Sequence, residues 1–389
     1  MTTSPALSHN ARTLPNTPVW DDSTWESLPT LEGDATCGTC VIGLGGSGLT
    51  AIGELLARGE DVIGVDAIDV GAGAAGRNGG FLLAGAYDFY HDAVRLHGAR
   101  QARAIYEATL QEIHRIATAT PDCVQFVGSR RLAANEAEIA DCREQMRVMH
   151  ADGLQVEWYD GPDGIGLTLR SDAACNPLVR CRTLARAVES AGARLFARTA
   201  VTDVARGRVT TSRGVIHCQR VIVAVDGKLE LLLPELRGRV RTARLQMLST
   251  APTTERMVPC PTYYREGFEY WQQTPDGSLA IGGFRDRAGE SEWTADTTPA
   301  NPVQALLEAF LRETLGVQAP ISHRWAASAA YSNTGLPVVE ETRDGVWVMG
   351  GYSGTGNVIG ALCARALVAL AVDGDSAPAQ LLIPNHYQM

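Results

Sequence analysis

The sequence predicts an α/β fold, and three observations within residues 39–66 support that prediction. A short apolar run over residues 40–42 is followed by three glycines with the spacing G-x-G-x-x-G. Residues 47–58 then carry apolar side chains on one helical face, and residues 61–65 form a second apolar run that ends at an acidic residue. Strand, glycine turn, helix and second strand in this order predict a βαβ unit with two parallel strands.

The glycine turn predicts a Rossmann-like dinucleotide site. Gly43 permits the tight turn, Gly45 lets the backbone approach a pyrophosphate, and Gly48 allows the helix to pack closely on the strand. The N-terminus of the following helix offers free N–H groups to the phosphates, and the acidic residue about 20 positions further on would bind a ribose hydroxyl. The residues expected to contact the dinucleotide here are Gly43, Gly45, Gly46, Ser47, Gly48, Asp66 and Ala67.

A second glycine-rich stretch, residues 73–80, indicates which dinucleotide binds. It reads G-A-A-G-R-N-G-G, and a nicotinamide-dependent dehydrogenase needs no such stretch directly after its second strand. It resembles the D-amino-acid-oxidase-like family of FAD-dependent amine oxidoreductases. The branch with glycine oxidase, sarcosine oxidase and γ-glutamylputrescine oxidase, of which the last looks nearest, often has serine where this chain has Ala75. The resemblance implies FAD contacts at Ala75, Arg77, Asn78, Gly79 and Gly80.

Residues 350–356 resemble the closing motif of the same family. They read G-G-Y-S-G-T-G before a helix, with Thr355 where the family usually has histidine. The helix N-terminus would stabilise the negative charge of the reduced flavin. The resemblance also places backbone near Val201, and the turn at Gly227, beside the cofactor, with an ordinary sheet hairpin as the alternative. The contacts implied in the closing motif are Gly351, Tyr352, Ser353, Gly354, Thr355 and Gly356.

The resemblance covers nearly all of the chain after residue 35 and implies two interleaved domains. The Rossmann-like FAD-binding domain would comprise residues 36–90, 170–240 and 335–389. A mixed-sheet substrate domain would comprise residues 91–169 and 241–334. Residues 1–35 are rich in Ser, Thr, Pro and Asp, and they predict an N-terminal arm that lies over the body.

The composition excludes several function classes. With a net charge of −10 and scattered basic residues, the chain of 389 residues is not expected to bind nucleic acid. No apolar run approaches the ~18 residues of a membrane span, and the first thirty residues lack a secretory signal. Nine dispersed cysteines suit reduced thiols, so a cytoplasmic protein is expected. The four histidines between residues 91 and 150 have no partners at ligand spacing, so no metal is expected.

The resemblance also implies a reaction. In this family a hydride passes from a carbon bearing a neutral amine to flavin N5, the imine is hydrolysed, and oxygen usually reoxidises the flavin to give hydrogen peroxide. Aromatic walls would suit a neutral amine, because burial disfavours the ammonium form. The candidates are Tyr264, Tyr270, Trp271 and Trp325, with packing in the hydrophobic core as the alternative for each.

Three features of the family are missing. Ala329 stands where the glycine-oxidase-like branch has an arginine that clamps the substrate carboxylate, and Ala280 stands near the sarcosine-oxidase lysine that promotes reaction with oxygen. Residues 326–334 contain no cysteine to tether the flavin, so the FAD is expected to be noncovalent. Arg265 or Arg285 could supply a relocated clamp, with surface or structural ion pairing as the alternative.

These features leave three functions open. The first is an enzyme that oxidises a small-molecule amine or N-substituted amino acid, with oxygen as the expected acceptor. The second is an α-amino-acid oxidase or dehydrogenase with a relocated carboxylate clamp. The third is a non-catalytic flavin-binding protein, suggested by the departures at Ala75, Ala280, Ala329 and Thr355. The cofactor motifs retained at both ends of the chain favour an enzyme.

Overall fold

The computed structural model describes residues 16–383, and its first sheet contains the predicted βαβ unit. β1 pairs in parallel with β2 on one side and β12 on the other, and β19 and β11 pair with different halves of β12. β1 begins at Ala35, earlier than predicted, because its first residues already pair with β12. The strands of this sheet are β10 (Val201–Ala205), β11 (Arg208–Thr211), β12 (Val215–Val223), β1 (Ala35–Ile42), β2 (Val62–Val65), β9 (Arg194–Phe196), β19 (Val346–Gly350) and β18 (Val338–Arg343).

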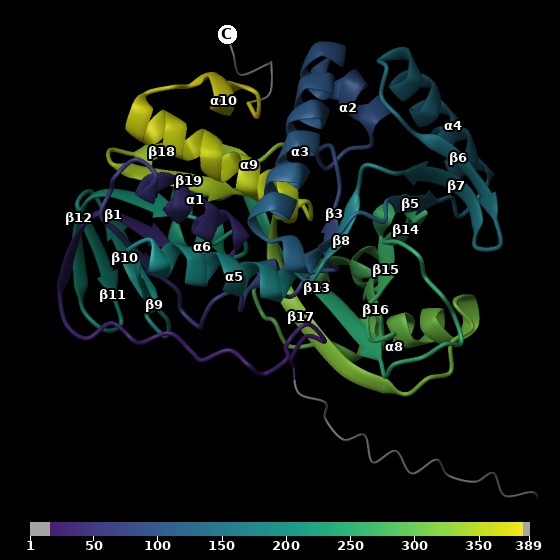
Figure 1. Ribbon diagram of the computed structural model, residues 1–389, viewed down its shortest axis with the longest axis horizontal. Helices are drawn as coiled ribbons and strands as arrows, with labels where there is room; N and C mark the ends of the chain where they lie inside the picture. Colours follow the sequence, from purple (N-terminus) through teal and green to yellow (C-terminus); the bar gives the residue numbers. More distant parts are fainter. Residues whose placement is uncertain (1–15, 384–389) are drawn as a thin grey trace, which may run out of the picture.

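Four helices pack beside this sheet and enclose its main hydrophobic core. α1 contacts α5 and α9, and α9 in turn contacts α3 and β19 (Figure 1). Leu49 and Ile52 of α1 share one buried cluster with Cys363 and Leu367 of α9. The helices are α1 (Gly46–Leu56), α3 (Ala99–Ala119), α5 (Pro177–Ser190) and α9 (Gly356–Val368).

One helix in the described part of the chain is long and apolar enough to cross a membrane. It spans Gly356–Asp373, has a mean hydropathy of 1.5, and is 61% buried inside the molecule. Length and composition alone are weak evidence, because core helices meet the same criterion. The contacts of α9 with α1, α3 and β19 are those of a core helix.

The second sheet is mixed and carries the predicted aromatic stretch. Its long strands β13 and β17 pair antiparallel from Val240 opposite Ser332 to Thr250 opposite Ile321. α8 (Asn301–Ala309) packs on it, and its Leu307 joins a hydrophobic cluster with strand residues. The strands in order are β17 (Ile321–Ser332), β13 (Val240–Thr250), β16 (Leu279–Gly283), β15 (Glu269–Gln273), β14 (Thr262–Tyr264), β5 (Ser129–Leu132), β7 (Gly164–Leu169) and β6 (Glu157–Gly161).

The two sheets alternate along the chain. The first sheet takes its strands from residues 35–65, 194–223 and 338–350, and the second from residues 129–169 and 240–332. This alternation is the pattern expected for two interleaved domains, although the domain boundaries themselves stay a prediction.

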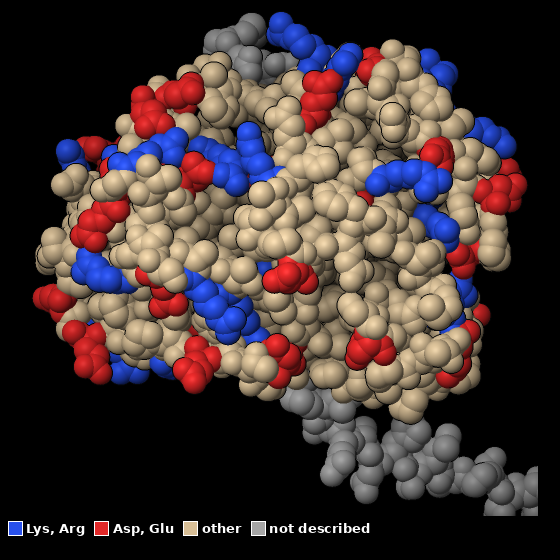
Figure 2. Space-filling view, in the orientation of Figure 1, with Lys and Arg blue, Asp and Glu red and all other residues tan. Residues whose placement is uncertain are grey.

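Acidic and basic side chains are interspersed on the face shown in Figure 2. Many charged side chains of the described chain pair, as Arg239 does with Glu340 at 2.7 Å and Arg170 with Glu157 at 2.6 Å. Exposed pairs of this kind contribute only about 0–1 kcal/mol each to the free energy of unfolding. The stability of the fold therefore rests mainly on its buried clusters.

A small third sheet lies between the other two, and the buried Asp172 connects it to the second sheet. Asp172 Oδ1 accepts the backbone N–H of Ala84 at 2.9 Å, and its Oδ2 accepts the hydroxyl of Ser129 at 2.6 Å. Burial raises the pKa of Asp172 to about 7, although both hydrogen bonds favour the carboxylate. The strands of this sheet are β3 (Phe81–Leu82), β8 (Ala173–Cys175) and β4 (Val124–Gln125).

We predict that Asp172 makes the stability of the fold depend on pH. The folded state holds the Asp172 proton more tightly than the unfolded chain, so this contribution is present below the ordinary pKa of 3.8 and is lost as the pH rises through about 7. Asp172→Asn keeps one acceptor and one donor and should remove the dependence. Relative to the variant, the wild type should lose up to about 4 kcal/mol of unfolding free energy between roughly pH 4 and pH 8, at ~1.36 kcal/mol per pKa unit.

Chemical denaturation at a series of pH values measures this difference. Asp160→Asn, at an exposed position of β6, is the matched control and should retain the wild-type profile. Parallel pH profiles for the wild type and Asp172→Asn would show that the buried carboxylate does not titrate as described.

Candidate functional site

A cavity of about 1130 Å³ opens where the strands of the first sheet end. Gly43 follows β1, Asp66 follows β2, and residues 224–227 follow β12, and all of them line the cavity. In open α/β sheets, ligands bind in the crevice outside the carboxyl ends of the strands. Residues of the first glycine turn, of the stretch 73–80 and of the closing motif 350–356 line the same cavity. The structure therefore brings the predicted cofactor motifs together.

The glycines of the first turn each have a steric reason. Gly43 has a φ of +105°, and a Cβ there would lie 2.6 Å from the carbonyl oxygen of Ala224. A Cβ on Gly48 would lie 1.9 Å from the carbonyl oxygen of Gly43, so Gly48 serves helix packing and does not line the cavity. A Cβ on Gly45 would lie 3.0 Å from the Cβ of Ala75. The start of α1 therefore presents open backbone to the cavity.

Asp66 lies directly after β2 and accepts two backbone N–H groups, from Leu44 at 3.0 Å and from Ile68 at 2.9 Å. These bonds hold the carboxylate in place while lone pairs remain for a ligand hydroxyl. Burial raises the pKa of Asp66 above its ordinary value, and the two bonds oppose that shift. The other predicted residues of this part that line the cavity are Gly46, Ser47, Ala67, Val201 and Gly227.

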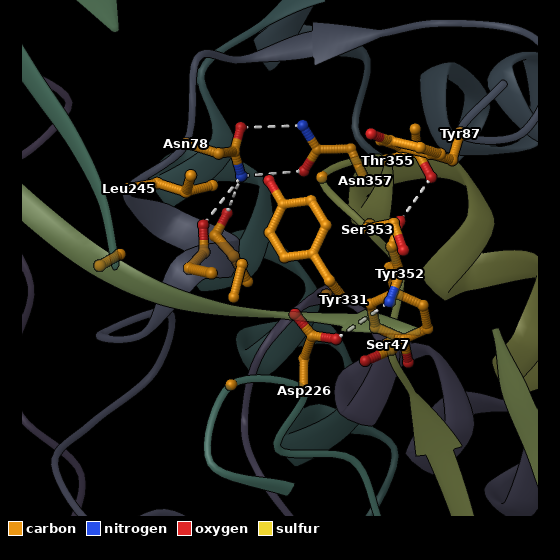
Figure 3. A pocket seen from close by; sticks show the side chains of 18 of the residues that line it. Ser47, Asn78, Tyr87, Asp226, Leu245, Tyr331, Tyr352, Ser353, Thr355 and Asn357 are labelled. Carbon is orange, nitrogen blue, oxygen red and sulfur yellow. Dashed lines mark hydrogen bonds between the residues drawn. The ribbon is translucent and has the colours of Figure 1, made fainter. Parts of the chain in front are cut away.

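A reciprocal amide pair joins the glycine-rich stretch of residues 73–80 to the helix that follows the closing motif of residues 350–356 (Figure 3). Asn78 Nδ2 donates to Asn357 Oδ1 at 3.1 Å, and Asn357 Nδ2 donates to Asn78 Oδ1 at 2.9 Å. Asn78 Oδ1 also accepts the backbone N–H of Gly80 at 2.8 Å. Gly80 does not line the cavity. It packs on the backbone of Cys175, and a Cβ on Gly80 would lie 2.2 Å from the Cys175 carbonyl oxygen. Asn357 was not among the predicted site residues, although its place directly after the closing glycines was a usable signal.

The N-terminal arm contributes to this site. Trp20 Nε1 donates to the carbonyl oxygen of Asn78 at 2.8 Å, and Asn16 Oδ1 accepts from the Arg77 guanidinium and from the Ala326 N–H at 3.1 Å. Arg77 also donates to the carbonyl of Ala326 at 3.0 Å, and burial lowers the pKa of Arg77. Asn16 and Arg77 both line the cavity, so the arm closes one of its edges. The first fifteen residues of the predicted arm lie outside the described residues.

Asp226 positions the closing motif. Its carboxylate accepts the backbone N–H groups of Gly351 at 2.9 Å, Tyr352 at 3.2 Å and Ala330 at 3.1 Å. Burial raises the pKa of Asp226 to about 6, against the effect of the three bonds. Gly351 does not line the cavity, whereas the rest of the predicted motif does, namely Tyr352, Ser353, Gly354, Thr355 and Gly356. The sequence analysis did not single out Asp226, although an acidic residue at the turn after β12 was the available signal.

The four predicted aromatic residues lie in different surroundings. Tyr270 lines the cavity. Tyr264 and Trp271 do not, and their rings pack on Phe310 with centroid separations of 6.1 and 5.5 Å. Trp325 is fully buried, and its indole N–H donates to the backbone of the glycine-rich stretch at 2.8 Å. The structure therefore brings Tyr270 to the cavity wall and packs the other three against neighbouring side chains, which was the alternative for each.

Two tyrosines that the sequence analysis did not single out also line the cavity (Figure 3). Tyr87 and Tyr331 are T-shaped neighbours with ring centroids 6.3 Å apart. A Cβ on Gly354 would lie 3.6 Å from the Tyr331 hydroxyl, so this ring stands beside the closing motif. Ala329, at the expected clamp position, also lines the cavity. Because alternate residues of a strand share a face, Tyr331, two residues after Ala329, could have been predicted to line the cavity as well.

The two candidate clamp arginines differ in their partners. Arg265 does not line the cavity and is held by Glu269 at 2.8 Å and Asp286 at 2.7 Å. Arg285 lines the cavity, with its guanidinium 4.4 Å from the ring centroid of Tyr331. No carboxylate of the described chain forms an ion pair with Arg285. Arg265 is therefore a structural residue, and of these two arginines Arg285 is the one that faces the cavity without a carboxylate partner in the described chain.

One side-chain cluster has the spacing of a metal site. The ligand atoms of His91, Asp92 and Asp141 all lie within 4.8 Å of one another. The buried guanidinium of Arg131 donates to Asp141, and His91 Nε2 lies 2.8 Å from the same carboxylate. Because the Arg131 cation already neutralises Asp141, the cluster is accounted for as an ion-paired and hydrogen-bonded network, and the absence of a metal stays a prediction.

Comparison with known proteins identifies the family. The family model described as "FAD dependent oxidoreductase" matches residues 39–370. The chain belongs to this family. It is similar to the gamma-glutamylputrescine oxidoreductase of Escherichia coli, at 27% identity over 89% of this chain and 86% of that protein. A probable oxidoreductase of Haemophilus influenzae is 24% identical over 86% of this chain and 83% of its own length.

Solved structures of the same fold resemble this FAD-dependent oxidoreductase over most of its length. L-proline dehydrogenase from P. horikoshii has a TM-score of 0.75 at 16% identity, covering 92% of this chain and 99% of its own. Glycine oxidase from Bacillus cereus has a TM-score of 0.73 at 18% identity, covering 90% and 98%. The predicted α/β fold and the predicted FAD dependence are therefore confirmed.

The cavity of this FAD-dependent oxidoreductase fits its cofactor. Open backbone at Gly45, the fixed carboxylate of Asp66 and the linked glycine-rich stretches all face one space. The N-terminus of α9, at Gly356, faces the same space and offers the positive end of its dipole. Among the described residues that line the cavity there is no cysteine, which supports the prediction that FAD is held noncovalently.

We predict that acid precipitation releases all of the bound FAD into the supernatant, and that Gly45→Val yields colourless protein. A branched side chain at Gly45 would meet Ala75 and fill the space beside the pyrophosphate-binding backbone. Gly53→Ala is the matched control in the same helix, because a Cβ there meets only Val188 at an ordinary 3.8 Å. Colour that stays in the pellet would contradict noncovalent binding, and a yellow Gly45→Val protein would contradict the assigned turn.

Proposed function

We propose that the protein oxidises the CH–NH bond of an amine or N-substituted amino acid to an imine. The supporting observation is a wall of three tyrosines, Tyr87, Tyr270 and Tyr331, beside the cofactor motifs. A Cβ on Gly79 would lie 3.0 Å from the Tyr270 ring, and a Cβ on Gly354 of the closing motif would lie 3.6 Å from the Tyr331 hydroxyl. The wall thus lies beside residues 73–80 and 350–356, the two stretches that we expect to contact FAD.

The chain's own contribution to this reaction is to bind, orient and desolvate the substrate. FAD, when bound, supplies the acceptor for the hydride that leaves the substrate carbon, while the amine nitrogen loses a proton. The tyrosine rings exclude water and favour a neutral amine over an ammonium, because burial disfavours the charged form. Water then hydrolyses the released imine to a carbonyl compound and an amine, or ammonia where the substrate is a primary amine.

We further propose molecular oxygen as the acceptor that regenerates the oxidised cofactor, giving one hydrogen peroxide per substrate oxidised. The names of similar proteins include both glycine oxidase and L-proline dehydrogenase, so the acceptor needs a direct test. Ala280, near the place of the oxygen-promoting lysine expected from the family resemblance, is fully buried and does not line the cavity. Equal yields of peroxide and oxidised substrate would support oxygen as the acceptor.

A second candidate function is the oxidation of substrates that carry a carboxylate, including α-amino acids. Arg285 favours it, because its guanidinium faces the cavity without a carboxylate partner in the described chain. An arginine fork matches a carboxylate in geometry and charge. Ala329 lines the same cavity without any charge, so a carboxylate would bind at Arg285 and not at the position expected from the family.

We predict that an amine or N-substituted amino acid reduces the bound flavin under anaerobic conditions, faster than glycine or D-alanine does. Tyr270→Ala should slow this reduction at least tenfold and leave the FAD content unchanged, because the wall orients the reacting carbon. Stopped-flow absorbance measures the rate. Trp271→Phe is the matched control, because Trp271 lies on the same strand but packs in the hydrophobic cluster that contains Leu307 of α8.

Two results would contradict this proposal. Faster reduction by glycine or D-alanine than by every amine in the panel would favour the second candidate. Reduction by no compound of either class would favour the non-catalytic flavin-binding protein.

We predict that Arg285→Met raises KM for substrates with a carboxylate by about 10- to 100-fold, with little change in kcat, since a hydrogen-bonded charge pair contributes about 1.5–3 kcal/mol. Amines without a carboxylate should be unaffected, and Arg285→Lys should recover part of the loss. Arg287→Met, an exposed arginine two residues away, is the control. Equal losses for both substrate types would assign Arg285 a structural role.

A further inference from the structure

Arg180, in the first turn of α5, is a buried cation without a partner. The residue is 3% exposed, and its Nε is buried without a hydrogen bond. No carboxylate, carbonyl or hydroxyl of residues 16–383 bonds to its guanidinium. Burying an unpaired guanidinium is strongly unfavourable, so such a residue is expected to meet an anion.

The guanidinium of Arg180 lies at the phosphate-binding end of the cavity. A Cβ built on Gly46, at the start of α1, would lie 2.6 Å from Arg180 Nη1. Arg180 lines the cavity together with Gly45, Gly46 and Ser47. The N-terminus of α1 carries a partial positive charge, so a second positive charge beside it is unfavourable unless an anion lies between them.

No carboxylate among residues 16–383 forms an ion pair or hydrogen bond with Arg180. The charge of Arg180 acts instead on the buried thiols of Cys123, Cys175 and Cys181. Burial raises the pKa of Cys175 to about 12 and that of Cys181 to about 11, so these thiols are neutral. The charge of Arg180 is therefore available to a ligand.

We propose that Arg180 pairs with the pyrophosphate of FAD. The arginine fork supplies two parallel N–H donors, which match phosphate oxygens in geometry and charge. The free backbone N–H groups at the start of α1 approach the same anion from the glycine turn. This assignment concerns cofactor binding and holds whichever substrate the enzyme oxidises.

The test measures cofactor affinity and stability separately, with the full chain freed of FAD by dialysis against bromide. Arg180→Met should weaken binding of FAD and of ADP by the same factor, about 10- to 100-fold, because both ligands carry the pyrophosphate. Isothermal titration gives both dissociation constants. Arg180→Lys should retain part of the affinity, since it keeps the charge but loses the fork.

The thermal midpoint of the FAD-free protein distinguishes this role from a structural one. Removal of an unpaired buried charge should leave the midpoint of Arg180→Met unchanged or raise it, although the variant binds FAD more weakly. Arg186→Met, an exposed arginine of the same helix, is the matched control and should alter neither quantity.

Three results would overturn the proposal. Unchanged FAD affinity would show that Arg180 meets no part of the cofactor. A loss for FAD without a loss for ADP would place Arg180 beside another part of the cofactor. A clear drop in the thermal midpoint of the FAD-free variant would show that Arg180 supports the fold.

Discussion

The site depends on the amide pair between Asn78 and Asn357. These residues are 279 positions apart in the chain, and each donates one hydrogen bond to the other. Asn78 lies in the stretch after β2, and Asn357 lies in the first turn of α9, so their contact fixes two cofactor motifs relative to each other. An amide is suited to this task, because it is neutral and carries a donor NH2 and an acceptor oxygen side by side, so that two amides can bond reciprocally.

Buried carboxylates hold the turns around this pair. Asp226 ties the backbone of the closing motif to β17, and Asp172 ties the third sheet to the second. In both residues burial disfavours the charge while N–H or O–H donors favour it. Conformations that supply fewer donors would leave these carboxylates unsatisfied, so the native arrangement of the turns is favoured over alternatives.

The sequence predicted those parts of the structure that depend on neighbouring residues. The βαβ unit and the glycine turns follow from local spacing, and the structure has them where expected. The residues of the aromatic wall were harder to predict, because adjacent residues of a strand face opposite sides of the sheet. Tyr270 and Trp271 of β15 therefore cannot both reach the cavity, and the pattern alone does not say which one does.

The residues that the sequence analysis missed act across long separations. Tyr331 reaches the cavity because β17 crosses beside the closing motif, and Asp226 acts through backbone groups of residues 330 and 351. Arg265 and Arg285 are equivalent in the sequence, and only the carboxylates of Glu269 and Asp286 decide which of them is neutralised. A local pattern can place such a residue at a turn or on one face of a strand, but it does not say which distant backbone or side chain the residue meets.

The attachment of the N-terminal arm has a consequence for biosynthesis. Asn16 bonds to the backbone N–H of Ala326, 310 positions later, and Trp20 bonds to the carbonyl of Asn78. The ribosome therefore makes Asn16 and Trp20 long before β17, and the surface that binds them is complete only when β17 has been made. A contact between residues so far apart in the sequence forms late in folding, because the long loop between them must close first. The cofactor site thus stays open at that edge while the chain is being synthesised, and a segment that is made early is among the last to dock.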